Sequence, residues 1–128
     1  MARLSGVRVL LVEDANDVRD VLHFLLEGEG AVVISTGRGL EAIELALTGP
    51  YDVLLCDLGL PDIPGDMVIR EVKANSPGAL RVIIATGQGE PYIGQAKAAG
   101  ADVVLTKPLL WSVLLDWMVS AGSAPQAA

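Results

Sequence analysis

The chain has 128 residues, 9 basic and 16 acidic side chains, and a formal net charge of −7. This length suits a single domain with one hydrophobic core, and an apolar content of 52% argues against disorder. The acidic balance disfavours binding to nucleic acid or an anionic membrane surface, because both need clustered Lys and Arg. One histidine and one cysteine, Cys56, exclude an intrachain disulfide and disfavour a zinc site. The sequence shows no apolar leader and no run of membrane length, so we expect a cytoplasmic protein.

Short apolar runs alternate with longer helical patterns along the chain. In chain order, these patterns predict a strand over 7–12, a helix over 17–27, a strand over 31–35, a helix over 40–47, a strand over 52–56, a helix over 66–74, a strand over 81–85, a helix over 91–99, a strand over 102–105 and a helix over 110–120. Five β-α units in sequence predict an α/β fold with a five-stranded parallel sheet and helices on both faces.

The predicted organisation is a single domain. The chain is too short for a closed eight-stranded barrel, so we expect the sheet to be open and doubly wound. The domain should span 1–128, with its core over about 7–120 and a frayed tail over 121–128. Cys56 lies inside an apolar run, and we expect it to be a small core residue rather than a nucleophile.

Polar side chains stand directly after the predicted strands. Glu13 and Asp14 follow the first strand, Asp57 the third, Thr86 the fourth and Lys107 the fifth. In doubly wound sheets, ligands bind beyond the carboxyl ends of the strands, so these side chains should gather at one edge. Three close carboxylates repel one another unless a cation lies among them, and hard oxygen ligands suit Mg²⁺. A lysine and a hydroxyl beside them suit phosphate oxygens, and a carboxylate can accept a phosphoryl group.

This ordered set resembles the receiver domain of two-component response regulators. The matching segments are Glu13-Asp14, Asp57 within the sequence CDLGLP, Thr86-Gly87 and Lys107-Pro108. The resemblance covers nearly the whole chain and implies a flavodoxin-like sheet with strand order 2-1-3-4-5. It implies a stand-alone regulator or the receiver of a hybrid histidine kinase. Either would be a phosphorelay signalling domain rather than an enzyme, with a histidine kinase or a histidine phosphotransfer protein as partner.

The resemblance also implies a role for each site residue. Asp57 would accept the phosphoryl group from a phosphohistidine, Lys107 would bind that group, and Thr86 would swing towards it on activation. The bond between Lys107 and Pro108 is often cis in such domains, a geometry that proline makes accessible. An in-line water would later remove the phosphoryl group.

The implied cofactor is Mg²⁺. The resemblance assigns Asp14 and Asp57 as direct ligands, Glu13 as a ligand through water, and the backbone carbonyl of Gly59 as a further ligand. A plainer interpretation of Glu13 and Asp14 is an acidic helix start that the helix dipole favours.

Two positions depart from the family pattern. Val104 stands three residues before the lysine, where the family usually has an aromatic residue that relays the signal. Gly59 stands two residues after the acceptor, where a larger side chain often shapes water access, and Gln88 is a candidate to influence that water. Val104 favours the alternative of a degenerate receiver, a protein-interaction module that is never phosphorylated.

A competing motif lies in the second β-α unit. Gly37, Gly39 and Ala42 follow a strand and open a helix, and Asp57 lies 20 residues after Gly37, which imitates a dinucleotide-binding fingerprint. The motif is in the wrong unit, and a five-stranded domain lacks the second half of such a fold. We therefore disfavour a nucleotide-binding fragment.

The last predicted helix is apolar over a wide arc. One stripe contains Leu110, Val113, Leu114 and Trp117. A second stripe, made of Trp111, Leu115 and Met118, extends the apolar arc beyond what packing on a sheet needs. We expect this second stripe to be a homodimer or effector surface, with wide core contact as the alternative.

Overall fold

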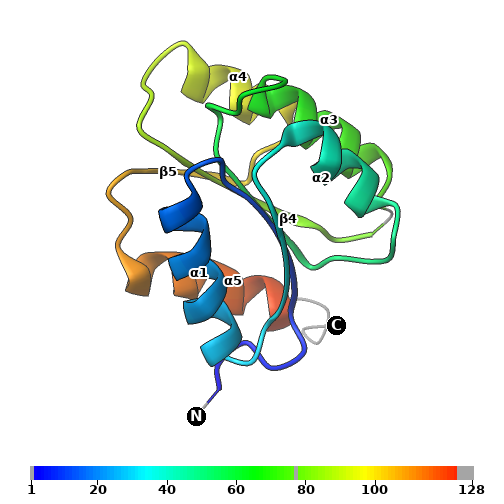
Figure 1. The fold of residues 1–128 in the computed structure, drawn as a ribbon, viewed down its shortest axis with the longest axis vertical. Coiled ribbons are helices and arrows are strands. Elements are labelled where there is room, and N and C mark those ends of the chain that lie inside the picture. Colours follow the sequence, from blue (N-terminus) through cyan, green and yellow to red (C-terminus); the bar gives the residue numbers. More distant parts are fainter. Residues whose placement is uncertain (1, 77, 124–128) are drawn as a thin grey trace.

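A computed structural model describes residues 2–76 and 78–123, and in it strands and helices alternate strictly along the chain (Figure 1). The elements are β1 (Arg8–Val12), α1 (Asn16–Gly28), β2 (Val32–Thr36), α2 (Gly39–Ala46), β3 (Val53–Cys56), α3 (Gly65–Ala74), β4 (Arg81–Thr86), α4 (Tyr92–Ala99), β5 (Val103–Thr106) and α5 (Trp111–Ser123). Each predicted element is present, with its bounds shifted by a few residues.

The five strands form one parallel sheet in the order β2-β1-β3-β4-β5. This confirms the predicted doubly wound, flavodoxin-like arrangement. Helices α1 and α5 cover one face of the sheet, and α2, α3 and α4 cover the other (Figure 1). The strand order reverses between β1 and β3, so the residues that follow these two strands lie beside each other at the crevice where such folds bind ligands.

Each central strand contributes to two cores. Val53 and Leu55 of β3 pack with α1 and α5, whereas Leu54 and Cys56 pack with the other three helices. Alternate side chains of a strand point to opposite faces, which explains why β3 is apolar at every position. Burial raises the pKa of the Cys56 thiol far above its ordinary value, with smaller contributions from the charges of Asp57 and Glu13. Cys56 is therefore a neutral core residue, as predicted.

The C-terminal helix corrects one prediction. Leu115 is 4% exposed and Met118 is 0% exposed, and Trp111 packs against the same core. The exposed apolar residues at this end are Leu110, at 70%, and Val113, at 38%. Leu114 of the first stripe is also fully buried, and Trp117 packs partly buried against the same core. The prediction of a partner surface on Trp111, Leu115 and Met118 is thus wrong, and the alternative of wide core contact is confirmed, because residues of both stripes face the sheet.

The end of the chain differs from the prediction as well. Helix α5 continues to Ser123, so residues 121–123, expected in a frayed tail, are helical. The rest of that tail, 124–128, lies outside the described residues. Within 2–76 and 78–123, no helix combines the length and apolar character needed to cross a membrane.

Candidate functional site

Three carboxylates meet where β1 and β3 end. Val12 pairs with Cys56 in the register of these strands, and the Asp57 N–H donates to the Val12 carbonyl at 3.0 Å. Glu13 and Asp57 are therefore side by side, and Asp14 follows directly. One carboxylate oxygen from each of Glu13, Asp14 and Asp57 lies within 4.8 Å of the others. The structure brings these predicted acidic residues together from positions 43 and 44 residues apart.

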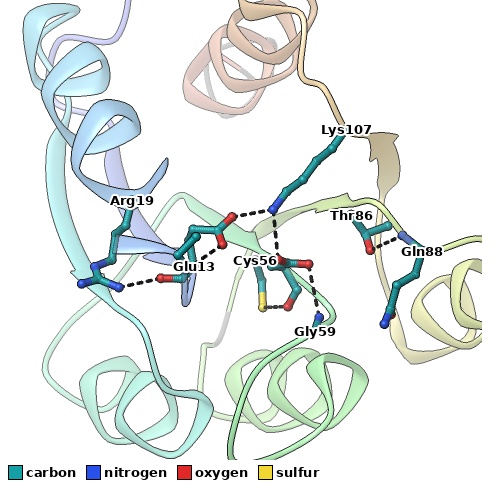
Figure 2. Close-up of polar contacts among 9 residues, drawn as sticks. Glu13, Arg19, Cys56, Gly59, Thr86, Gln88 and Lys107 are labelled. Atoms are coloured by element: carbon teal, nitrogen blue, oxygen red, sulfur yellow. Dashed lines mark hydrogen bonds and ion pairs between the residues drawn. The ribbon is translucent and has the colours of Figure 1, made fainter. Parts of the chain in front are cut away.

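Lys107 joins two of these carboxylates. Its Nζ donates to Glu13 Oε1 at 2.8 Å and to Asp57 Oδ2 at 3.0 Å (Figure 2). The side chains of Glu13 and Asp57 are only 4% and 12% exposed, whereas that of Lys107 is 29% exposed. Burial alone would lower the pKa of Lys107, but its hydrogen bonds and charge pairing with Glu13 and Asp57 outweigh burial and raise it. The lysine is thus a permanent cation at neutral pH.

The donor set fits a hard divalent cation. Glu13, Asp14 and Asp57 offer carboxylate oxygens only, and Asp14 is exposed at the mouth of the cluster. Lys107 offsets one of the three negative charges, so the cluster retains an excess of negative charge that a cation would relieve. The Glu13 carboxylate also accepts a hydrogen bond from the Ala15 N–H at 3.1 Å. Oxygen ligands of this kind suit Mg²⁺ or Ca²⁺ rather than a softer metal.

Thr86 and Gly59 border the acidic cluster from β4 and from the loop after β3. Thr86 is fully buried, and its Oγ1 accepts a hydrogen bond from the Gln88 N–H at 3.0 Å (Figure 2). The Gly59 N–H donates to Asp57 Oδ1 at 3.2 Å. An ideal Cβ on Gly59 would lie 3.8 Å from Gln88 Nε2, so the Gln88 side chain faces the position two residues after Asp57.

The structure also shows two positions that the family resemblance singled out, one that follows the family pattern and one that departs from it. The bond between Lys107 and Pro108 is cis, as the resemblance implied. Val104 pairs in register with Ile84 and packs partly buried against the core beneath α2, α3 and α4. Position 104 therefore carries no aromatic ring.

The glycines of the competing motif have an internal packing role. An ideal Cβ on Gly39 would lie 2.5 Å from the Ile63 side chain and 2.9 Å from that of Val68, so glycine allows α2 to approach α3 closely. The first N–H groups of α2, at Gly39 and Leu40, donate to the carboxylate of Asp62 at 2.8 and 2.9 Å. An aspartate of this chain thus occupies the position that a phosphate would take in a dinucleotide site.

Asp62 should therefore stabilise the protein in a pH-dependent way. The hydrogen bonds from Leu40 and Gly39 lower the pKa of the Asp62 carboxyl, although desolvation opposes them. A lowered pKa means that this stabilisation is complete above the ordinary value of 3.8 and is lost as the pH falls through the folded-state value. In urea unfolding, Asp62→Ala should have a lower midpoint than the wild type at neutral pH, and the gap should close in acid. An equal gap at every pH would contradict this role; Asp62→Asn, which keeps the shape without the charge, is the control.

Sequence reasoning missed two residues that organise the site's surroundings. Asp62 reaches α2 from 22 residues away, and Arg19 on α1 donates to the main-chain carbonyl of Glu13 at 2.8 Å. Neither belongs to an apolar period or a strand end. The only available signal was the pair of closely spaced glycines at 37 and 39, which indicates that another group approaches the backbone closely there. The glycines do not identify that group.

Comparisons with known proteins agree with this geometry. The family model described as response regulator receiver domain matches residues 9–118. The cell cycle transcriptional regulator CtrA of Caulobacter vibrioides is 36% identical over 106 residues, which cover 80% of this chain and 44% of that protein. The cell cycle response regulator CtrA of Brucella ovis is 32% identical over 102 residues, with the same coverage. The chain thus spans less than half the length of these relatives.

Solved structures show the same fold. A CheY-like response regulator receiver domain protein from Methanospirillum hungatei has a TM-score of 0.88 at 25% identity, over 96% of this chain and 98% of that one. A response regulator protein from Burkholderia pseudomallei, solved with a phosphorylated aspartic acid, a calcium ion and citrate, has a TM-score of 0.82 at 27% identity. That match covers 95% of this chain and 72% of the other.

Proposed function

The chain belongs to the response regulator receiver family, and from this premise we propose that it accepts a phosphoryl group on Asp57 in a Mg²⁺-dependent reaction. The observation that carries the proposal is the cluster itself: Lys107 bridges Glu13 and Asp57, and Asp14 lies beside them. Receiver domains are signalling domains, so the product would act by changing protein contacts.

Asp57 would be the nucleophile. One of its carboxylate oxygens forms a bond to phosphorus while the bond between phosphorus and the donor's imidazole nitrogen breaks, and the electron pair of that bond stays on the nitrogen. A carboxylate nucleophile has no proton to lose in this step, so no catalytic base is needed. Positioning and charge neutralisation therefore account for most of the rate.

Lys107 and Thr86 would bind the transferred group. Lys107 is shared between two carboxylates, so its ammonium can keep one partner while it donates to a phosphoryl oxygen on Asp57. The Thr86 hydroxyl accepts from the Gln88 N–H, and its own proton can be donated to a second phosphoryl oxygen. If Thr86 rotates to make this hydrogen bond, its contact with the Gln88 N–H changes, and with it the start of the loop between β4 and α4.

The metal would be held by residues of the same edge. We assign Asp14 and Asp57 as direct ligands, Glu13 through water, and the Gly59 carbonyl as a further ligand. The ion would supply positive charge against the oxygens of the transferring group. Asp14 is the exposed member of the cluster, so it is the carboxylate most accessible to an incoming cation.

The donor would be a histidine kinase or a histidine phosphotransfer protein. An apolar groove of about 400 Å³ runs between α1 and the loop before α5, and Lys107 forms one of its walls. Val18 and Val21 of α1 are partly exposed there, and Leu109 lies opposite. Because Lys107 both lines this groove and contacts Asp57, a partner seated in the groove could bring its phosphohistidine to Asp57.

The proposal is tested by intact-mass spectrometry after incubation with a small acyl phosphate and Mg²⁺. We expect the wild type to gain one phosphoryl group that is labile in alkali, and Asp57→Asn to gain none. Removing Mg²⁺ with a chelator should prevent the gain. An unmodified wild type, under conditions where Mg²⁺ binding is demonstrated, would support the alternative of a degenerate receiver that binds partners without phosphorylation, which Val104 favours.

A further inference from the structure

Arg19 makes a contact that the proposed chemistry does not use. Its Nη1 donates to the main-chain carbonyl of Glu13 at 2.8 Å (Figure 2), while the Glu13 N–H donates to the Thr36 carbonyl at 3.0 Å. The Glu13 carbonyl belongs to the peptide that joins Glu13 to Asp14. Arg19 therefore fixes the plane of the peptide from which the exposed Asp14 carboxylate projects.

The guanidinium is itself held in place on two sides. Its Nη2 donates to Asn16 Oδ1 at 2.6 Å, so the planar group makes a two-pronged contact that a lysine could not reproduce. On the other side lies Gly37, where an ideal Cβ would be 2.7 Å from Nη1. Glycine at position 37 thus leaves the space that the guanidinium occupies, between the loop after β1 and the loop after β2.

We propose that Arg19 is a positioning residue for the metal site, and that it sets the direction of Asp14 by holding the Glu13 carbonyl. The inference rests on the proposed function in one respect, namely that Asp14 is a metal ligand. Because the contact is to a main-chain oxygen, its effect is geometric. Substituting a residue that orients a metal ligand typically weakens metal affinity by about 10- to 100-fold.

Two substitutions disturb the same contact by different routes. Arg19→Gln removes the guanidinium. Gly37→Ala keeps the charge but adds a Cβ only 2.7 Å from the present position of Nη1, so the guanidinium must move. If both act through one contact, the double variant should be no worse than Arg19→Gln alone. Arg38→Gln is the charge control, since Arg38 is exposed on the neighbouring loop. Gly28→Ala, with open space around its Cβ, is the glycine control.

Two measurements follow these variants. Calorimetric titration with Mg²⁺ should show a Kd raised about 10-fold in Arg19→Gln, raised less in Gly37→Ala, and unchanged in both controls. Amide NMR spectra of the metal-free proteins should show the Asp14 and Ala15 signals displaced in the same two variants. A purely structural role would lower thermal stability without changing the Kd.

Several results would overturn the inference. Unchanged Mg²⁺ affinity in Arg19→Gln would contradict the inference. An equal loss of Mg²⁺ affinity in Arg38→Gln would show that the effect comes from the loss of a positive charge rather than from the contact with Glu13. A further loss when Gly37→Ala is added to Arg19→Gln would show that the two do not share a contact. Should Arg19→Gln fail to fold, Gly37→Ala decides the question. If the wild type itself binds no Mg²⁺, the proposed function fails, and the amide signals still show whether Arg19 sets the conformation of the loop.

Discussion

Lys107→Met should slow phosphorylation by a small acyl phosphate by about 100-fold or more, the usual cost of removing one preorganised donor from a developing charge. The same substitution should tighten Mg²⁺ binding. In the wild type, the ammonium lies 2.8 Å from a Glu13 oxygen and 3.0 Å from an Asp57 oxygen. Methionine leaves the three carboxylates without that cation, so a metal ion meets a stronger negative field. Opposite changes in rate and affinity are the signature of this role.

The measurement pairs phosphorylation kinetics with a Mg²⁺ titration of the same samples. Lys97→Met is the matched control, because Lys97 is an exposed lysine on α4, and it should change neither quantity. If Lys107→Met lost rate and Mg²⁺ affinity together, Lys107 would be organising the carboxylates rather than competing with the metal for them. Unchanged phosphorylation would contradict its assignment to the phosphoryl group.

Leu115→Ala should lower the free energy of unfolding by about 2–5 kcal/mol, the range for truncating a large buried side chain. Leu110→Ala, which makes the same chemical change directly before the same helix, should alter it by no more than about 0.5 kcal/mol. The difference arises because Leu115 is 4% exposed within the core beneath α5, whereas Leu110 is 70% exposed.

Urea unfolding of both variants, compared with the wild type, tests this contrast. Equal losses would mean that α5 is not seated as described. A stable Leu115→Ala variant whose oligomeric state had changed would restore the interpretation of this stripe as a partner surface.

The fold was predictable because its signals are continuous. Runs such as 53–56 are apolar at every position, and burial on both faces of the sheet explains this. The acidic cluster was predictable for a related reason: the strand order alone places the residues after β1 and β3 at one crevice. Neither inference needed the orientation of a side chain.

Two kinds of feature could not be predicted: how much of the surface of a helix is buried, and which contacts a single side chain makes with a distant segment. An apolar surface over a wide arc fits either a broad core contact or an additional partner surface, and the sequence of α5 does not distinguish the two; Leu114, Leu115 and Met118, which come from both stripes, proved to be buried. Arg19 and Asp62 join segments through one side chain each, so they leave no periodic pattern. The sequence alone does not distinguish a glycine that allows a neighbouring helix to pack closely from one that allows a phosphate to approach.

The central claim is that one carboxylate among three accepts the phosphoryl group. Borohydride reduction of the phosphorylated protein, followed by peptide mass mapping, converts an acyl phosphate into a stable alcohol and so identifies the acceptor. The account predicts reduction at Asp57 alone, dependent on Mg²⁺. Reduction at Glu13 or Asp14, or equal phosphorylation when Mg²⁺ is withheld from the incubation, would contradict it.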